Sequence, residues 1–201
     1  MLDIDIRLEP DGIKRLADKL LRLRVGLEVQ AKTALKQVGE QYYEIVVSNI
    51  GVHTGGTVLG ESWAPLSRVW LEEKKRRGFI LEIWEAETLI KQAVKVYDVE
   101  STPDGFKVFA GIKSGGPADS YDYKTALEKA IRNEFGAFVM AAQEHQPSYA
   151  THAGGTPSGQ GIPARPLFGP AAREMVYNPA EKARMIETFK NATKVAISGI
   201  W

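Results

Sequence analysis

The sequence predicts an α+β fold in which a long N-terminal amphipathic helix packs on an antiparallel β-sheet with a central hairpin. Apolar residues recur at steps of three and four from Ile13 to Ile45, and two β-prone runs surround the turn sequence STPDG. Several shorter helical patterns with capping residues follow. We expect a single domain over residues 1–201, with further short helices and two long flexible loops at 48–62 and 143–161.

The N-terminal region predicts one strand followed by the long helix. Apolar and charged residues alternate from Asp3 to Leu8, which is the period of a half-buried strand, and the turn sequence EPDG ends it. The helix that follows is about 50 Å long at 1.5 Å per residue. Its other faces carry charged residues that water solvates. Its apolar stripe consists of Ile13, Leu16, Leu20, Leu23, Leu27, Ala31, Ala34, Val38, Tyr42 and Ile45.

The two predicted loops share a composition that favours neither helix nor strand. Residues 48–62 (SNIGVHTGGTVLGES) are rich in glycine and small polar residues, and residues 143–161 add proline, histidine and glutamine. Loops of this length are usually functional or disordered. We therefore expect both segments to be flexible.

Short helices and one hairpin account for the middle of the chain. Ser67 and Gly78 are of the residue types that begin and end a helix, and a second helical pattern from Ala126 ends near Gly136. The sequence from Lys91 to Lys113 reads as two strands, because proline, aspartate and glycine in that order fit a tight reversal. The residues of the second strand that we expect to face the core are Phe106, Val108, Ala110 and Ile112.

Residues 178–201 predict a C-terminal helical extension. Asn178 is a suitable N-cap, Pro179 suits the first helical position, and Glu181 at the third position would complete a capping-box-like start.

Composition excludes several classes of protein and favours none. The 201 residues contain 26 lysines and arginines against 25 aspartates and glutamates, so no overall charge draws the chain to nucleic acid or to a membrane surface. The absence of cysteine excludes disulfides and thiolate chemistry. The N-terminus lacks the basic and apolar pattern of a signal peptide, and no apolar run is long enough to cross a bilayer. We expect a soluble protein that is used without export.

No motif in the chain predicts catalysis. His53, His145 and His152 lie in irregular segments and form no HExxH pair. The glycine-rich sequences GVHTGG and AGGTPSGQG lack the spacing of phosphate-binding loops, and no GxSxG sequence is present. We therefore expect no enzyme, no cofactor and no metal site. A hydrolase with an unrecognised acid and base is the remaining enzymatic alternative.

The sequence EEKKRRG, ending at Gly78, contains the one dense basic cluster, Lys74 to Arg77. Its simplest interpretation is a solvated helix end, and its alternative is a DNA-binding module that uses these four cations. Trp63 and Trp70 nearby fit core residues and interface anchors equally well. Trp84 is expected in the core.

Three sequence motifs, in their order, resemble a known family. GESWAPLSRVWLEEKKRRGFIL, AIRNEFGA and IPARPLFGPA, with a hairpin between the first two, are similar to the phage virion-morphogenesis and tail-completion proteins, including the Mu-like G and P2-like S types and related head-tail joining families. The chain departs from that pattern at EIWEAETL, which reads as helical where many relatives have threonine and glycine. The matching residues are Trp63, Pro65, Leu66, Lys74, Ile80, Leu81, Glu134, Phe135, Gly136, Ile162, Pro163, Ala164, Arg165, Pro166, Leu167 and Phe168.

The resemblance, which covers most of the chain from about Gly12 to Ala172, implies a structural protein of the bacteriophage particle. It implies a homo-oligomeric, hexameric ring in the neck that joins the tail to the head-side connector and leaves a channel for DNA. Its partners would be copies of itself, connector or stopper proteins, and tail tube or terminator proteins. It would lie in the virion, and in the host cytoplasm during assembly, without a membrane. A tail terminator or a minor tail protein is the alternative within this class.

The segment GIPARPLFGPAAREM is the strongest carrier of the resemblance. Pro163 and Pro166 fix their own φ angles and favour extended residues before them, and Pro170 suits a helix start. We predict that Arg165 points outward or bonds the region of Glu134, while Leu167 and Phe168 anchor the segment to the core. The candidate structural and interface residues are Trp63, Trp70, Glu134, Phe135, Gly136, Pro163, Arg165, Pro166 and Phe168.

Overall fold

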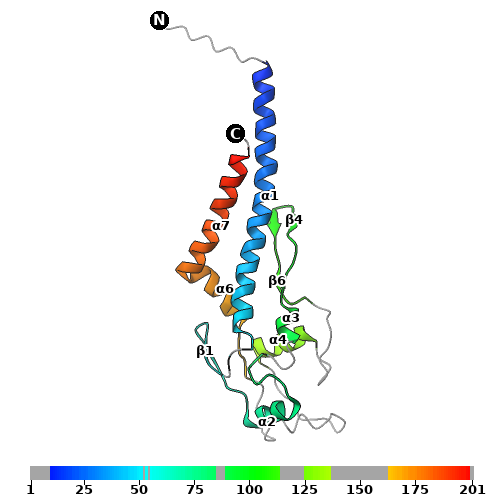
Figure 1. Cartoon of the computed structure of the whole chain (residues 1–201), viewed down its shortest axis with the longest axis vertical. Coiled ribbons are helices and arrows are strands. Elements are labelled where there is room, and N and C mark those ends of the chain that lie inside the picture. Colours follow the sequence, from blue (N-terminus) through cyan, green and yellow to red (C-terminus); the bar gives the residue numbers. More distant parts are fainter. Residues whose placement is uncertain are drawn as a thin grey trace.

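One long helix organises the protein. The structure, a computed structural model, describes residues 10–51, 53, 55–84, 89–113, 125–136 and 163–199. Helix α1 (Pro10–Asn49) is about 60 Å long at 1.5 Å per residue, and the other elements gather along its C-terminal half (Figure 1). The predicted mixture of helix and antiparallel sheet is confirmed, but in place of one sheet with a central hairpin the described residues form separate two-stranded sheets. The predicted strand from Asp3 to Leu8 lies outside the described residues.

Helix α1 begins earlier than the sequence pattern indicates. The prediction that EPDG forms a turn is wrong for Pro10 to Gly12, which are the first helical residues. Proline is well suited to a first helical position, because the N–H group that it lacks would have no partner inside the helix.

Within the described residues, three two-stranded antiparallel sheets accompany the helices. Strand β4 (Glu100–Thr102) pairs with β5 (Gly105–Lys107) across the turn at Pro103 and Asp104, so the hairpin predicted from STPDG is confirmed. The same two chain segments pair again farther from the turn, where strand β3 (Lys95–Val96) pairs with β6 (Ala110–Gly111).

The third sheet corrects the prediction of an irregular loop over 48–62. Strand β1 (Gly56–Val58) pairs with β2 (Glu61–Trp63). The connecting residues Leu59 and Gly60 have φ angles of 49° and 78°, the left-handed conformation that a two-residue hairpin turn uses. Leucine rarely adopts this conformation, so the sequence Leu-Gly is a much weaker hairpin signal than Asn-Gly.

The shorter helices mostly begin and end where the sequence predicts. Helix α2 (Arg68–Arg77) is capped by the Ser67 side chain and ends at left-handed Gly78. Helix α4 (Ala126–Phe135) starts with a capping box at Thr125 and ends at Gly136. Helix α6 (Phe168–Tyr177) contains Pro170 in its first turn.

Three local predictions are wrong, at the start of the first hairpin strand, at the capping box of the C-terminal helix, and at the start of EIWEAETL. Helix α3 (Leu89–Ala93) replaces the predicted start of the first strand. Helix α7 (Pro179–Ser198) has Asn178 as its N-cap, as predicted. The Glu181 side chain, however, accepts a hydrogen bond from Gln41 of α1. Glu82 to Trp84 are not helical, and residues 85–88 lie outside the described part.

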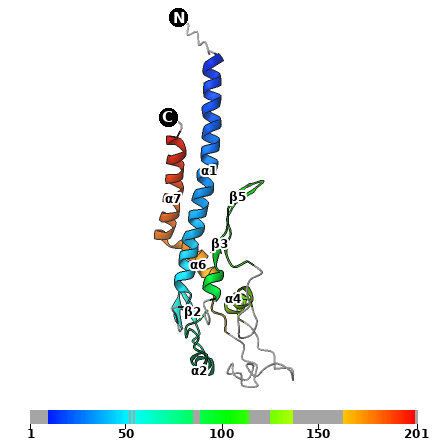
Figure 2. The ribbon, with the colours of Figure 1, turned by 45° about the vertical axis from the view of Figure 1, so that its right-hand side comes forward.

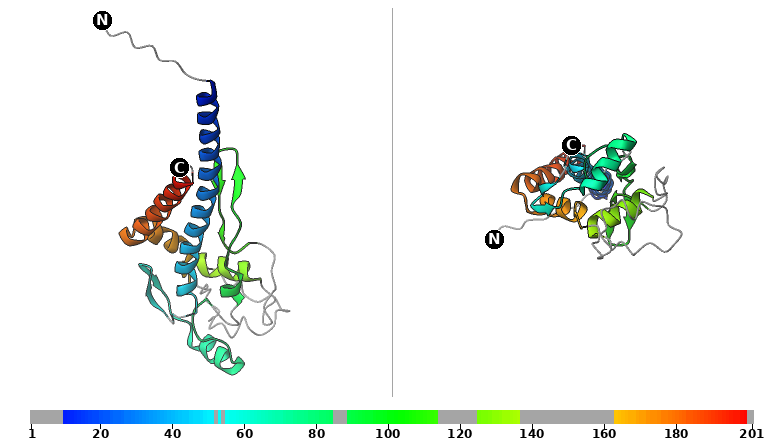
Figure 3. Two further views of the ribbon diagram at one scale, coloured as in Figure 1. Left: turned by 45° about the horizontal axis from the view of Figure 1, so that its top comes forward. Right: turned by 90° about the horizontal axis from the view of Figure 1, so that it is seen from below.

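The C-terminal half of α1 lies between two layers, with α7 on one side and the hairpin on the other (Figure 3). Helix α7 runs antiparallel to α1, because Gln41 Nε2 donates to the carbonyl of Glu181 over 2.9 Å while Gly26 lies beside Ala196. On the hairpin side, Gly39 faces Val96 and Val108. The predicted core face of the second strand is confirmed, since its four residues are partly buried while Lys107, Phe109 and Lys113 are exposed.

The hydrophobic core lies around the C-terminal end of α1. Trp63 and Trp84 lie at its centre with ring centroids 6.4 Å apart, and Phe168 packs edge-on against Trp84 at 5.6 Å. Its buried members are Val46, Ile50, Val58, Trp63, Ile83, Trp84, Ile90, Val94, Ala130, Leu167 and Ala171.

The N-terminal half of α1 corrects the prediction of a continuous packed stripe. Ile13, Leu16 and Leu20 are all more than half exposed, because α7 and the hairpin end before they reach them (Figure 2). Periodicity predicts that a helix has an apolar side and gives no information about how much of that side the rest of the chain covers.

Gly39 and Gly26 offer a test of the packing on the two sides of α1. A Cβ at Gly39 would lie 2.9 Å from Cγ1 of Val96, whereas a Cβ at Gly26 would meet Ala196 at 3.7 Å or more. We expect Gly26→Ala to raise the free energy of unfolding by about 0.5–1 kcal/mol through helix propensity. Gly39→Ala should lower it by about 1 kcal/mol, because the branched Val96 side chain must move. Urea unfolding followed by circular dichroism measures both, and equal stabilisation by the two variants would contradict the packing described.

Candidate functional site

The proline-rich segment before α6 is held by backbone contacts to three other parts of the chain. The N–H of Arg165 donates to the carbonyl of Asn133 at the end of α4 over 2.6 Å. The indole N–H of Trp84 donates to the carbonyl of Arg165 (3.1 Å), and that of Trp63 donates to the carbonyl of Pro166 (2.9 Å). The two prolines keep the segment extended, so its carbonyl groups are free of local hydrogen bonds and can accept from the indoles.

The side chain of Arg165 is buried and bonds the loop after β2. It is 5% exposed, and its Nε and Nη2 atoms donate to the carbonyls of Ala64 (2.7 Å) and Pro65 (3.1 Å). Burial lowers the pKa of Arg165 below its ordinary value. Among the described residues no carboxylate forms an ion pair with it, so the dipoles of carbonyl groups stabilise its charge.

The predicted position of Arg165 is therefore partly wrong. The side chain does not point outward, and it reaches the loop after Trp63 because the extended backbone between the two prolines directs it there. Only the backbone of Arg165 bonds the region of Glu134, through Asn133. Leu167 is fully buried and Phe168 packs against the core, as predicted.

Glu134 caps helix α6 from another helix. Its Oε2 atom accepts from the N–H groups of Leu167 (2.7 Å) and Phe168 (3.0 Å), and its Oε1 atom accepts from Gly169 (3.0 Å). These N–H groups have no partners inside α6, and the positive end of the helix dipole favours a carboxylate there. Gly169 permits the approach, because a Cβ at this position would lie 3.3 Å from the carboxylate oxygen.

Tyr42 connects this arrangement to α1. Its hydroxyl donates to the carbonyl of Phe168 over 3.1 Å. Burial, with a smaller contribution from the nearby charge of Glu134, raises the pKa of Tyr42 to about 12. We refer to the residues joined here as the junction: Tyr42, Trp63, Ala64, Pro65, Trp84, Asn133, Glu134, Arg165, Pro166, Leu167, Phe168 and Gly169.

The structure brings some of the predicted site residues together and separates others. Trp63, Glu134, Arg165, Pro166 and Phe168 belong to the junction, and Trp63 is thus a core residue. The candidates outside it are Trp70, partly buried in α2; Phe135, 78% exposed; Gly136, at the end of α4; and Pro163, exposed.

For two members of the junction, Tyr42 and Trp84, nothing in the sequence indicated a contact with the proline-rich segment. Tyr42 is one of ten residues on a helical stripe, and Trp84 is expected only as a core residue. Their hydrogen bonds to the proline-rich segment join residues that are 126 and 81 positions apart.

Three of the four cations in the basic cluster have partners within the chain. Lys74 is buried, and its Nζ atom donates to the carbonyls of Ile80 (2.9 Å) and Glu82 (2.6 Å), so the interpretation of a fully solvated helix end is wrong for this residue. Arg76 and Arg77 bond the carboxylate of Glu73. These hydrogen bonds, that of Arg76 first, lower the pKa of Glu73 to about 2.

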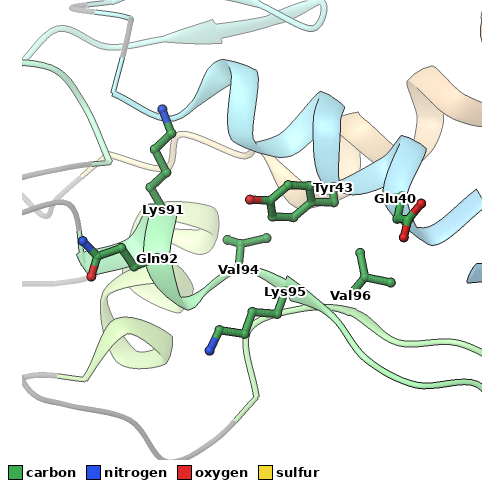
Figure 4. A pocket seen from close by; sticks show the side chains of 7 residues that line it. All are labelled: Glu40, Tyr43, Lys91, Gln92, Val94, Lys95 and Val96. Atoms are coloured by element: carbon green, nitrogen blue, oxygen red, sulfur yellow. The ribbon is translucent and has the colours of Figure 1, made fainter. Parts of the chain in front are cut away.

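An open hollow of about 680 Å³ lies between α1 and the stretch from α3 to β3 (Figure 4). Its lining contains one carboxylate and no histidine, so it does not hold the pair of carboxylates or histidines that would support the hydrolase alternative. Its lining residues are Glu40, Tyr43, Lys91, Gln92, Val94, Lys95 and Val96.

The described histidine has a local partner. His53 Nε2 lies 3.2 Å from Oδ1 of Asn49, and its ring packs edge-on against Trp63. His145 and His152 lie outside the described residues. Within the described ranges, no three acidic or histidine side chains are arranged to hold a metal ion.

Comparisons with known protein families, with curated proteins and with solved structures find no match for this chain. Of the helices in the part of the chain that the structure describes, none combines the length and the apolar character that crossing a bilayer requires.

The buried guanidinium can be tested by substitution. We expect Arg165→Ala to lower the free energy of unfolding by about 3 kcal/mol, because two charge-assisted hydrogen bonds disappear and the Ala64 and Pro65 carbonyls lose these donors. The control is Arg68→Ala, which breaks an exposed pair with Glu72 and should cost about 0.5 kcal/mol or less. Urea unfolding measures both changes, and equal losses would show that the contacts of Arg165 do not stabilise the fold.

Tyr42 predicts a specific response to alkaline pH. Its pKa in the folded protein is raised from 10.0 to about 12, so its contribution to stability is present in full below pH 10 and disappears as the pH rises toward 12. Over this range the free energy of unfolding should fall more steeply for the wild type than for Tyr42→Phe. Tyr177→Phe, at an exposed position, is the control. A phenolate absorbance difference between wild type and Tyr42→Phe that titrates near pH 10 would contradict the burial described.

Proposed function

We propose that this protein is a structural subunit of a bacteriophage particle, which forms a homo-oligomeric ring in the neck and joins the tail to the head-side connector. The observation that carries the proposal is the convergence of the motif residues on the junction. Trp63, Glu134 and Arg165 come from the three separate motifs of the resemblance, and Trp63 and Glu134 both bond the short segment that contains Arg165.

The junction suits a ring subunit that must keep one rigid conformation while other proteins bind to it. It links α1, the loop after β2, the end of α4 and the start of α6 through hydrogen bonds that are partly buried. Buried polar contacts of this kind hold their elements in one arrangement, since breaking any of them leaves an unpaired polar group. A near-neutral overall charge is compatible with a channel wall that does not retain passing DNA.

The arrangement of the basic cluster does not favour the DNA-binding alternative. Lys74 is directed into the chain, and Arg76 and Arg77 bond Glu73. Phosphate binding would have to compete with these internal partners. No observation on the described residues favours a tail terminator or a minor tail protein over a neck subunit, and the two differ from it in position along the particle.

Deletion of the gene from a phage that encodes this chain tests the proposal. We expect electron microscopy to show filled heads and complete tails that are not joined. Supply of the wild-type chain should restore joined, infectious particles. Arg165→Ala should restore fewer particles, because the junction is weakened, while Arg68→Ala should restore them fully.

The purified chain provides a second measurement. Mixed with connector and tail proteins of the same phage, it should enter a ring-shaped complex visible by electron microscopy. Joined particles in the deletion strain, together with a chain that stays monomeric in that mixture, would refute the proposal.

A further inference from the structure

The exposed half of α1 carries a regular apolar line. Ile13, Leu20 and Leu27 are spaced by seven residues, and Leu16 and Leu23 lie between them at steps of three and four. This is the repeat with which helices pair side by side in coiled coils. Of these side chains, those nearest the N-terminus are the most exposed: Ile13 is 52%, Leu16 is 59% and Leu20 is 57% exposed. We call Ile13, Leu16, Leu20, Leu23 and Leu27 the N-terminal stripe.

The N-terminal stripe continues an interface that already exists within the protein. The next positions of the same seven-residue repeat, Ala34 and Gln41, are buried. They lie on the stretch of α1 that α7 covers, between the contact of Gly26 with Ala196 and that of Gln41 with Glu181. Helix α7 ends at Ser198, and α1 projects beyond that end (Figure 2). Ile13, Leu16 and Leu20 continue the repeat on α1 toward its N-terminus and are exposed. A second helix would fit this continuation as α7 fits the covered part.

The charges around the N-terminal stripe indicate the chemistry of that helix. The segment from Asp11 to Leu27 contains five lysines and arginines and two aspartates. Lys19 borders the stripe on one edge and Arg24 borders it on the other, at the positions that face the flanks of a paired helix. A second copy of α1 would bring cations against cations, whereas acidic flanks would complement them.

The described helices of this chain do not supply such a partner. Helix α7 carries more basic than acidic residues and already covers the lower part of α1, and α2 is basic. Acidic and basic residues are equal in number in α4 and in α6.

A membrane surface is a poorer fit than a helix. Leu21, Val25 and Val29 are exposed on the opposite side of α1 from the stripe. A helix that lies in a membrane interface concentrates its apolar residues on one face.

We propose that the N-terminal stripe is a docking site for an amphipathic helix of another protein, with apolar residues at alternating steps of three and four and acidic residues at its flanks. The site is formed by α1 alone, so it does not depend on the role in a phage particle proposed above. Docking would bury the side chains of Ile13, Leu16 and Leu20, which are now more than half exposed, and removing such apolar surface from water favours association.

A pair of synthetic peptides tests the proposal on the full chain. Both contain about four heptads with leucine at the apolar positions. One has glutamate and the other lysine at the flanking positions. Fluorescence anisotropy at low salt should show binding of the glutamate peptide, with at least about tenfold weaker binding of the lysine peptide. Arg24→Glu should reduce the difference in affinity between the glutamate peptide and the lysine peptide.

Leu20→Asp tests the stripe, and Val25→Asp, on the other side of neighbouring turns of α1, is its matched control. Leu20→Asp should weaken binding of the glutamate peptide by about 30-fold or more, because a charge would enter the interface. Val25→Asp, at a position of similar exposure on the other side, should leave binding within about twofold, as expected for a site outside the contact. Circular dichroism should show the same helix content for wild type and both variants.

Each other outcome overturns the proposal. Equal binding of the two peptides, or binding of neither, would show that the stripe does not select an acidic helix. A wild-type dimer in analytical ultracentrifugation that Leu20→Asp dissociates would identify a second copy as the occupant. Binding to phosphatidylserine vesicles that Leu20→Asp abolishes, without binding of the glutamate peptide, would identify a membrane.

Discussion

The fold depends on a cation that has been removed from water. The guanidinium of Arg165 is stabilised by the carbonyls of Ala64 and Pro65, and a buried charge is tolerated only where such partners have fixed positions. That requirement couples the loop after β2 to the segment before α6. The indoles of Trp63 and Trp84 hold the backbone of the same segment, so the contacts of Arg165 can form only when the aromatic core is packed.

The carboxylate of Glu134 has the complementary effect at the next residues of the segment. It satisfies the unpaired N–H groups at the start of α6, which in most helices is done by a nearby side chain. Helix α6 therefore starts correctly only when α4 is in place. Tyr42 extends this dependence to α1 through the carbonyl of Phe168, so the helices and the proline-rich segment order together.

Helix α1 serves two purposes along its length. From Gly26 onward α1 is covered by α7, the hairpin and the core, and small residues allow close approach there, since Gly39 faces Val96 and Gly26 faces Ala196. Toward its N-terminus α1 keeps the same seven-residue apolar spacing with larger side chains, and Ile13, Leu16 and Leu20 are more than half exposed. Large apolar side chains that are regularly spaced and exposed are typical of interaction surfaces.

Much of the local structure could be predicted from the sequence, because capping, turn and periodicity signals act over a few residues: Ser67, Gly78, Asn178 and the turn STPDG all behave as their types predict. The sequence also predicted that the proline-rich segment is extended and that Leu167 and Phe168 anchor it to the core. The position of the Arg165 side chain, the hairpin closed by Leu59 and Gly60, and the covered length of α1 could be read only from the folded protein. These outcomes depend on contacts between residues far apart in the chain, such as the 101 positions between Arg165 and Ala64, and local propensity carries no information about such contacts.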